Sequence, residues 1–324
     1  MSPTEVFVAG LAFVFNSAGV EVTVLNSAGQ QVPRPSYFSG SAVEIAPGQY
    51  LSSAHIFYGP ITDGQANIYT SKGGNFFVQP ESDYNTSNPL NRNVSGSNPI
   101  STYNNISGYA PSPISTVPVH DVIAFSATTA DSNPTGVVLF SNPSISVISA
   151  YFASLNYTGY IATTDPGTGK VTTASQPHQA AMIATVNADH TFSMNQSAPP
   201  GFSGAGVWGT VSNGTNYVIG TIIGQNATQT QSLANYLSSS EFYKLFPETS
   251  TSISTKARNL VVGSKTGNDK LRGAYQTTDI IDLGNNNIIL AAGNGETINA
   301  GPGTNNVLFA SGANGIKGTG TTFV

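Results

Sequence analysis

The sequence contains no cysteine, and only 8% of its 324 residues are charged. Without thiols the chain forms neither disulfides nor zinc–thiolate sites, so packing and hydrogen bonds must hold the fold together. Lys and Arg number 11 against 16 Asp and Glu, which argues against nucleic acid as a partner. The sequence also lacks an apolar run of the ~18 residues that a membrane-spanning helix needs, so we expect no membrane span.

Glycine (34 residues), proline (19) and many Ser, Thr and Asn residues take the place of charge, while aromatic residues make up 10%. Because disordered chains are poor in aromatic residues, this composition indicates a folded protein. Short apolar runs alternate with Gly, Pro and Asn turns, and they predict strands such as Glu5 to Phe15, Val137 to Phe140, Ile145 to Tyr151 and Tyr217 to Ile223. That spacing is typical of an all-β barrel or sandwich.

One serine lies between closely spaced glycines, in the run Pro-Pro-Gly-Phe-Ser-Gly-Ala-Gly that ends at Gly206. A nucleophilic serine needs such a bend because its Oγ must stand clear of the backbone. Nearby N–H groups must also point at the oxygen that becomes negative during acyl transfer. Ser203 is therefore a candidate nucleophile. Taken alone, the run is equally compatible with an ordinary glycine–serine turn.

Two other segments carry groups that could activate a serine. His55 follows a strand-like run that ends in Ser-Ser-Ala, and Asp121 stands at the head of the β-branched run Val-Ile-Ala-Phe. The remaining histidines and most aspartates lie in polar turns or on outward strand positions. The chain order is histidine, aspartate, serine. An α/β-hydrolase would have the order serine, acid, histidine and the pattern Gly-x-Ser-x-Gly, but position 205 is alanine here.

These three segments resemble the chymotrypsin-like serine peptidases over roughly residues 1 to 248. The resemblance implies an all-β fold of two β-barrels of the chymotrypsin type with a C-terminal helix. It also implies that Ser203 attacks the peptide carbonyl, His55 takes its proton and Asp121 orients the imidazole. The N–H groups of Gly201 and Ser203 would form the oxyanion hole. The implied substrate is a protein or peptide, and catalysis needs no cofactor.

The same resemblance has implications for substrate specificity and for activation, through two residues near the serine. The position six residues before it, which holds an aspartate in trypsin-like relatives, is Ser197. We therefore expect the specificity pocket to prefer an uncharged side chain, since a buried cation without a partner is costly. Phe202 replaces the aspartate that in digestive relatives receives a newly cut N-terminus, so we expect no activation by trimming.

The end of the chain differs in character from the rest. A capping box at Ser238 and Glu241 predicts a helix near 239–246, and residues 249–259 are predicted to be a linker. In the tail, 260–324, the run Gly267 to Gly273 resembles the glycine-rich nonapeptide of RTX calcium-binding exoproteins, and weaker copies follow it. That resemblance implies a short β-roll or solenoid-like tail.

Calcium binding by this tail has one candidate ligand, Asp269. Aspartates in successive turns clamp the ion in the calcium-binding form of such repeats. Most of those positions are Asn or Thr here, and the chain after residue 249 has four acidic against six basic residues. A solenoid held by side-chain stacking without an ion is the alternative.

We therefore expect a secreted bacterial serine endopeptidase. The absence of cysteine favours a bacterial exoprotein, because secreted eukaryotic peptidases of this family usually carry disulfides. The tail's resemblance implies export by a one-step secretion apparatus that reads a C-terminal signal. The alternative is a catalytically inactive, peptidase-like adhesin or surface matrix-binding protein.

Overall fold

The computed structural model describes residues 3, 5–15, 23–25, 28–33, 35–53, 56, 61–62, 68–70, 76–80, 103–104, 121–126, 135–141, 143–164, 171–174, 179–188, 190–199, 201–212, 214–225, 228–238, 242, 259–263, 267–268, 270–273, 277–281, 285–286, 288–291, 297–299, 306–310, 315–317 and 321–323. This described part is mostly β, as the strand spacing predicted. None of its helices is long and apolar enough to cross a membrane.

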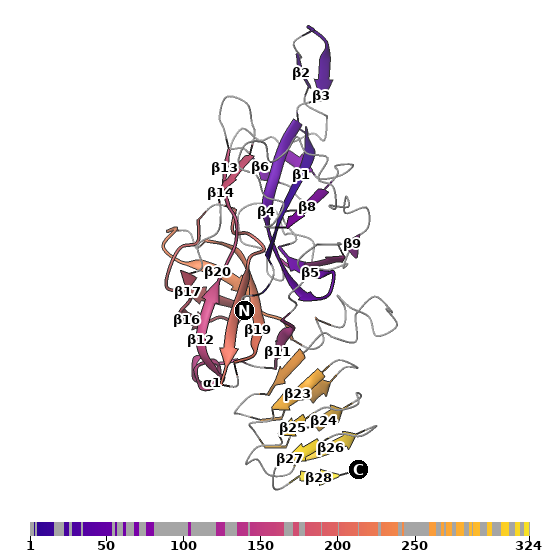
Figure 1. Cartoon of the computed structure of the whole chain (residues 1–324), viewed down its shortest axis with the longest axis vertical. Coiled ribbons are helices and arrows are strands. Elements are labelled where there is room, and N and C mark those ends of the chain that lie inside the picture. Colours follow the sequence, from indigo (N-terminus) through magenta and orange to yellow (C-terminus); the bar gives the residue numbers. More distant parts are fainter. Residues whose placement is uncertain are drawn as a thin grey trace.

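The first sheet has eight strands in the order β6-β7-β1-β4-β5-β10-β9, and the eighth strand, β8, also pairs with β1. Its strands are β1 (Glu5–Phe15), β4 (Pro35–Ala46), β5 (Gln49–Ser52), β6 (Ile61–Thr62), β7 (Ile68–Thr70), β8 (Phe76–Pro80), β9 (Tyr103–Asn104) and β10 (Ile123–Ser126). The long strands β1 and β4 form the upper part of the molecule in Figure 1, below the separate hairpin β2 (Thr23–Leu25) and β3 (Gln31–Pro33).

The second sheet has twelve strands and begins with β15-β12-β18-β19-β11. Strands β16, β17 and β20 join it through β19, and β13 pairs with β14 as a separate ribbon. The bounds are β11 (Val137–Phe140), β12 (Phe152–Tyr157), β13 (Ile161–Thr164), β14 (Val171–Ala174), β15 (Gln179–Ala180), β16 (Ile183–Val186), β17 (Thr191–Met194), β18 (Gly206–Val211), β19 (Asn216–Gln225) and β20 (Ser232–Asn235).

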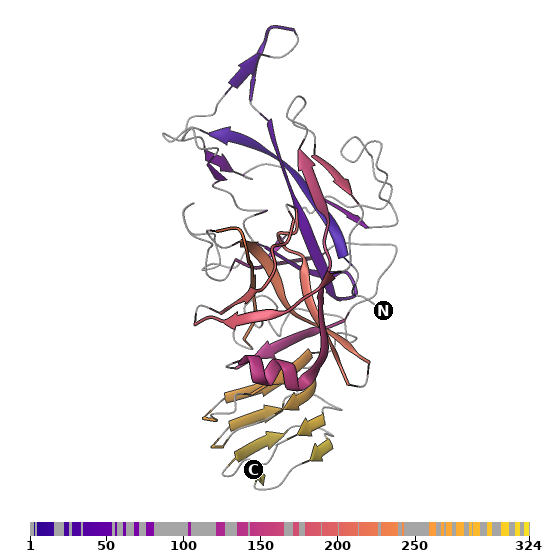
Figure 2. The same ribbon diagram turned by 90° about the vertical axis from the view of Figure 1, so that its left-hand side faces the viewer.

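The strand predicted at Ile145 to Tyr151 is wrong, because these residues form the helix α1 (Ile145–Tyr151). The Ser144 side chain accepts a hydrogen bond from the Val147 N–H and so caps the first turn. Val147 and Ile148 are the buried pair, whereas Ile145 is exposed. Ser146 and Ser149 stand three residues apart, a helical spacing, so the run does not have the strict alternation of a half-buried strand. Figure 2 shows α1 in magenta, where the second sheet meets the ladders of the tail.

The predicted helix near 239–246 lies outside the described residues apart from Phe242. The Phe242 N–H donates to the Ser238 carbonyl O at 3.0 Å, which is the hydrogen-bond spacing of an α-helix. Phe242 is buried in the core cluster that joins the two sheets.

Beyond Asn259 the chain forms two stacked parallel ladders, drawn in orange and yellow at the bottom of Figure 1. One ladder continues the second sheet through β21 (Asn259–Val262), β23 (Thr277–Ile281), β25 (Thr297–Asn299) and β27 (Gly315–Lys317). The other consists of β22 (Lys270–Gly273), β24 (Ile288–Ala291), β26 (Asn306–Ala310) and β28 (Thr321–Phe323). The buried residues Leu271, Ile289 and Leu308 stand in register across the second ladder.

The first tail strand is part of the preceding sheet. Strand β21 pairs in parallel with β11, so that Val137 lies opposite Asn259. One core cluster extends from Val43 and Leu51 in the first sheet, through Trp208, to Ile289 in the ladders. The boundaries at 248 and 260 and the linker between them stay predictions.

Candidate active site

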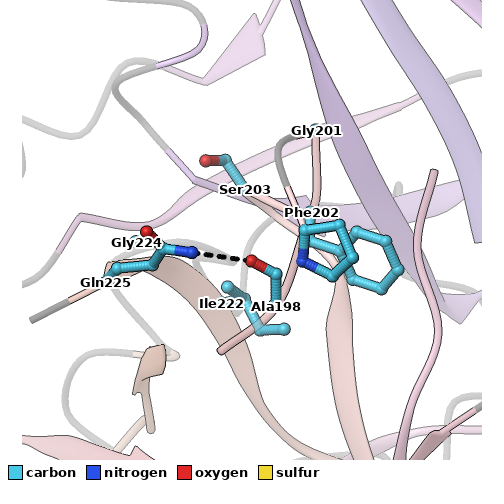
Figure 3. Close-up of a pocket in the computed structure, with 8 residues that line it drawn as sticks. Ala198, Gly201, Phe202, Ser203, Ile222, Gly224 and Gln225 are labelled. Atoms are coloured by element: carbon cyan, nitrogen blue, oxygen red, sulfur yellow. Dashed lines mark hydrogen bonds between the residues drawn. The ribbon is translucent and has the colours of Figure 1, made fainter. Parts of the chain in front are cut away.

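Ser203 lies in a tight turn between the core of the second sheet and the first sheet. The turn has two glycines at positive φ, Gly201 at 93° and Gly204 at 83°, a region that side chains other than glycine rarely adopt. Phe202 is fully buried and meets Tyr157 edge-to-face at 5.7 Å, whereas Ser203 is only half-buried. Figure 3 shows the two neighbouring side chains pointing in opposite directions. Burial of Phe202 thus fixes the turn and leaves the serine at the surface.

Gly204 is required by close packing as well as by its φ angle. A Cβ atom there would collide with the carbonyl O of Ser41 and the Oγ of Ser52, and would lie 3.0 Å from the Ser53 N. The Gly204 N–H donates to the Ile222 carbonyl O at 2.6 Å, which joins the turn to β19. The Ser203 turn therefore lies directly against the end of β5.

Ser41 on β4 holds the same turn from the side of the first sheet. Its N–H donates to the Ser203 carbonyl O at 2.7 Å, and its Oγ donates to the Gly201 carbonyl O at 3.1 Å. The same Oγ accepts from the Tyr160 N–H at 2.9 Å. Ser41 thus contacts the backbone on both sides of Phe202 and orients the turn relative to the first sheet.

His55 lies outside the described residues together with Ala54, but Ser53 and Ile56 are described. The Ser53 Oγ donates to the Ile222 carbonyl O at 2.6 Å, and Ile56 is buried against Gly40. A Cβ atom on Gly40 would lie 2.7 Å from the Ser203 carbonyl O. Ser53 and Ile56 therefore both lie near the Ser203 turn.

Asp121 is fully buried at the start of the β10 segment. Ile123 pairs with Ser52 in the antiparallel β5–β10 ladder. Asp121, two residues before Ile123, thus lies at the end of the ladder where β5 runs out toward residue 55. The structure brings the Asp121 end of β10 and the Ser203 turn to the same end of β5.

A pocket of about 260 Å³ opens beside the serine. Its lining consists of Ala198, Pro199, Gly201, Phe202, Ser203, Ile222, Gly224 and Gln225, of which none is charged (Figure 3). The Gln225 Nε2 donates to the Ala198 carbonyl O at 2.9 Å and to the Ser197 Oγ at 2.5 Å. Ser197 is exposed and reaches the pocket through Gln225.

Some backbone N–H groups in this turn have a hydrogen-bond acceptor among the described residues, and others do not. Those of Phe202 and Gly204 donate to the carbonyl O atoms of Pro199 and Ile222. Those of Gly201 and Ser203 donate to no acceptor within the described ranges. Gly201 and Ser203, which stand on either side of Phe202, both line the pocket.

The candidate calcium ligand Asp269 lies outside the described residues. Across the ranges that the structure covers, no three His, Cys, Asp or Glu side chains gather closely enough to hold a metal ion. The residues beside Asp269 form a turn in which the Asn268 N–H donates to the Asn285 carbonyl O at 2.8 Å.

Comparisons with known proteins gave matches among solved structures. No family model matches the chain, and no curated protein matches it. A Glu endopeptidase in complex with MPD is 17% identical with a TM-score of 0.43, covering 64% of this chain and 84% of its own. A thermostable serine protease from an extremophilic microorganism is 14% identical with a TM-score of 0.42, and the match covers 74% of this chain and 94% of that protease. The active form of an M. tuberculosis protease is 14% identical with a TM-score of 0.35, covering 72% and 76%. Likeness at this level does not assign the chain to a family.

Sequence reasoning missed three residues that shape this site: Ser41, Gln225 and Glu5. Ser41 and Gln225 act through partners far away in the sequence, so no local pattern marks them. Glu5 did leave a signal, because it is an acidic residue at the head of a long apolar strand. In the fold it is almost fully buried, and its Oε1 accepts from the Gly206 N–H at 3.0 Å.

Proposed function

We propose that this protein is a serine endopeptidase that acts through Ser203, His55 and Asp121. The observation that carries the proposal is the position of Ser203. It is half-buried and lines a pocket, in a turn where the N–H groups of Gly201 and Ser203 have no acceptor among the described residues, and that turn packs against Ser53, two residues before His55 in the sequence. The proposal includes a catalytic part of two β-barrels and a peptide or protein as substrate.

In the proposed mechanism His55 removes the proton from the Ser203 Oγ as the oxygen attacks the peptide carbonyl. The N–H groups of Gly201 and Ser203 stabilise the negative oxygen of the tetrahedral intermediate, a contribution of about 3–4 kcal/mol for such a donor. His55 then protonates the leaving amine, and the acyl-enzyme is hydrolysed by the reverse sequence. Asp121 keeps the imidazole in the required tautomer and stabilises the imidazolium.

A fluorophosphonate probe tests this proposal directly, because it reacts only with a serine that is activated as a nucleophile. We expect stoichiometric labelling of the wild-type protein, with the adduct on the peptide that contains Ser203. His55→Ala should abolish labelling. An unlabelled wild-type protein that is fully folded would favour the alternative, an inactive peptidase-like adhesin or matrix-binding protein.

The uncharged pocket leads to a prediction about cleavage specificity. Because the lining has no carboxylate to pair with a buried cation, peptide libraries should show cleavage after uncharged side chains. Ser197→Asp keeps an acceptor for the Gln225 Nε2 and adds a negative charge next to the pocket. It should raise kcat/KM for Lys or Arg substrates relative to uncharged ones by about tenfold or more. A wild-type profile dominated by Lys or Arg would contradict the assignment.

The glycine- and asparagine-rich tail is proposed to fold as a roll without calcium. Asn268 and Asn286 take up positive φ angles of 61° and 57°, a conformation that Asn tolerates better than most residues. Both are exposed at turns of the parallel ladders. The asparagines therefore have a backbone role, and a neutral amide gives calcium no net charge.

Melting of the full chain in calcium and in chelator tests this part of the proposal. We expect equal midpoints, because a ligand that does not bind the folded state cannot stabilise it. Asp269→Asn should leave both melting curves unchanged. Submicromolar calcium binding that disappears in Asp269→Asn would show instead that the remaining acidic residues form a site.

Secretion through a one-step apparatus is the last part of the proposal, and recovery of the intact chain outside the producing cell tests it.

A further inference from the structure

Glu5 is a buried residue at the start of β1, where β1 meets the start of β18. Only 5% of the residue is exposed. Its Oε1 accepts a hydrogen bond from the Gly206 N–H at 3.0 Å, and Gly206 is the first residue of β18, three positions after Ser203. A Cβ atom on Gly206 would lie 2.9 Å from this oxygen, so the glycine makes room for the carboxyl group.

A second connection links the same part of the first sheet to the other side of the serine. The Tyr160 hydroxyl donates to the Glu5 carbonyl O at 3.3 Å, and the Tyr160 N–H donates to the Ser41 Oγ. The Ser41 Oγ in turn donates to the Gly201 carbonyl O. The Glu5 side chain therefore contacts the backbone after Ser203 directly. Its carbonyl O is linked through Tyr160 and Ser41 to the backbone before Ser203.

The environment of this carboxyl group favours its neutral form. Burial raises the pKa of Glu5 well above its ordinary value, and the hydrogen bond from Gly206 opposes this shift only in part. The second oxygen, Oε2, has no partner among the described residues. The Tyr160 hydroxyl contacts Glu5 at its backbone carbonyl and not at its carboxyl group. Glu44, next to the paired residue Val43 on β4, points to the opposite face of the strand.

We propose that Glu5 is a positioning residue for Ser203, holding the start of β18 through the Gly206 N–H so that the serine turn keeps its geometry. This inference rests on the proposed peptidase function for its catalytic consequence. The anchoring itself is a property of the fold and can be measured without any substrate.

Glu44 supplies a matched control. It is also fully buried, and its Oε1 accepts a hydrogen bond from a glycine N–H, that of Gly48, at 2.8 Å. That bond lies in the turn between β4 and β5 and not in the serine turn. Glu5→Leu and Glu44→Leu each remove one buried acceptor of a glycine N–H. Glu5→Gln keeps an acceptor for Gly206 but cannot ionise.

We expect Glu5→Leu to lower kcat by on the order of tenfold to hundredfold with little change in KM, because a small displacement of a catalytic group is costly. Glu44→Leu should lower the melting temperature and leave kcat unchanged. Hydrogen exchange should show faster exchange of the Gly206 amide in Glu5→Leu, and normal exchange in Glu44→Leu and Glu5→Gln.

The pH dependence of stability tests the buried carboxyl group without any substrate. A carboxyl group with a raised pKa in the folded state binds its proton more tightly there than in the unfolded chain. Its stabilising effect is therefore lost as the pH rises from the ordinary value of 4.5 through the raised pKa. Wild type should lose stability over this interval relative to Glu5→Gln, which has no proton to lose.

Two results would overturn the inference. The first is normal exchange of the Gly206 amide in a folded Glu5→Leu protein, whatever its activity. The second result serves if Glu5→Leu does not fold. In that case, pH profiles of stability that superimpose for wild type and Glu5→Gln would overturn the inference. A wild-type protein that neither hydrolyses peptides nor reacts with fluorophosphonate would instead refute the peptidase function, and the exchange experiment would still decide whether Glu5 anchors the turn.

Discussion

Ser203→Ala should lower kcat for peptide hydrolysis by about four to six orders of magnitude and leave the fold intact. Triad members act as a unit, so removing the nucleophile removes nearly all of their shared contribution. The hydrogen bond that fixes Ser203 in the turn runs from the Ser41 N–H to the Ser203 backbone carbonyl, and alanine retains that carbonyl. Steady-state kinetics on an uncharged peptide substrate and a thermal melt measure the two effects separately.

Ser212→Ala is a suitable control for that experiment. Ser212 is an exposed turn residue directly after β18, so its hydroxyl can be removed with little effect on packing. It should match wild type in both rate and melting temperature. If the folded Ser203→Ala protein retained a rate within tenfold of wild type, another group would have to be the nucleophile, and the assignment of the site would be lost.

Local patterns in the sequence predicted much of the strand content. The long apolar run Glu5–Phe15 and the short run Val137–Phe140 form strands as expected, because each is bounded by turn residues and has no competing signal. The prediction for 145–151 failed although Ser146 and Ser149 are three residues apart, which is a helical spacing and not the alternation of a strand. The Ser144 cap marks the same helix start.

The supports of the site were not predictable from the sequence, because they depend on contacts between distant segments. The Ser41 hydroxyl meets the Gly201 carbonyl across 160 residues of chain, and Gly206 meets Glu5 across 201. Before the fold is known, a serine on β4 looks like any other serine on a strand. The serine turn itself was recognisable, since glycines crowded around one serine leave a local mark in the sequence.

The glycines themselves show the same limit of local reasoning. Gly204 and Gly214 have nearly the same backbone conformation, with φ angles of 83° and 84°. A Cβ atom on Gly214 would meet nothing within 4 Å, whereas one on Gly204 would collide with Ser41 and Ser52. Only the first sheet, packed against the turn, makes the two positions different.

This pair allows the cost of crowding at the nucleophile turn to be measured directly. Gly214→Ala should cost about 1–2 kcal/mol of unfolding free energy, which is the strain of a left-handed alanine. Gly204→Ala carries the same strain and must also displace the backbone of β4 or the end of β5. Overpacking of this kind typically adds about 1–3 kcal/mol. Urea unfolding of both variants gives the difference, in which the shared backbone term cancels.

The effect on catalysis should separate the two variants even more clearly. Moving β4 or β5 away from Gly204 displaces Ser41, and with it the hydrogen bond to the Ser203 carbonyl. We expect kcat of Gly204→Ala to fall by on the order of a hundredfold or more, because catalytic groups tolerate displacements of only a fraction of an ångström. Gly214→Ala, in the distant turn between β18 and β19, should keep the wild-type kcat. Equal kcat values for both variants would mean that the contact between the first sheet and the serine turn does not determine the geometry of the nucleophile.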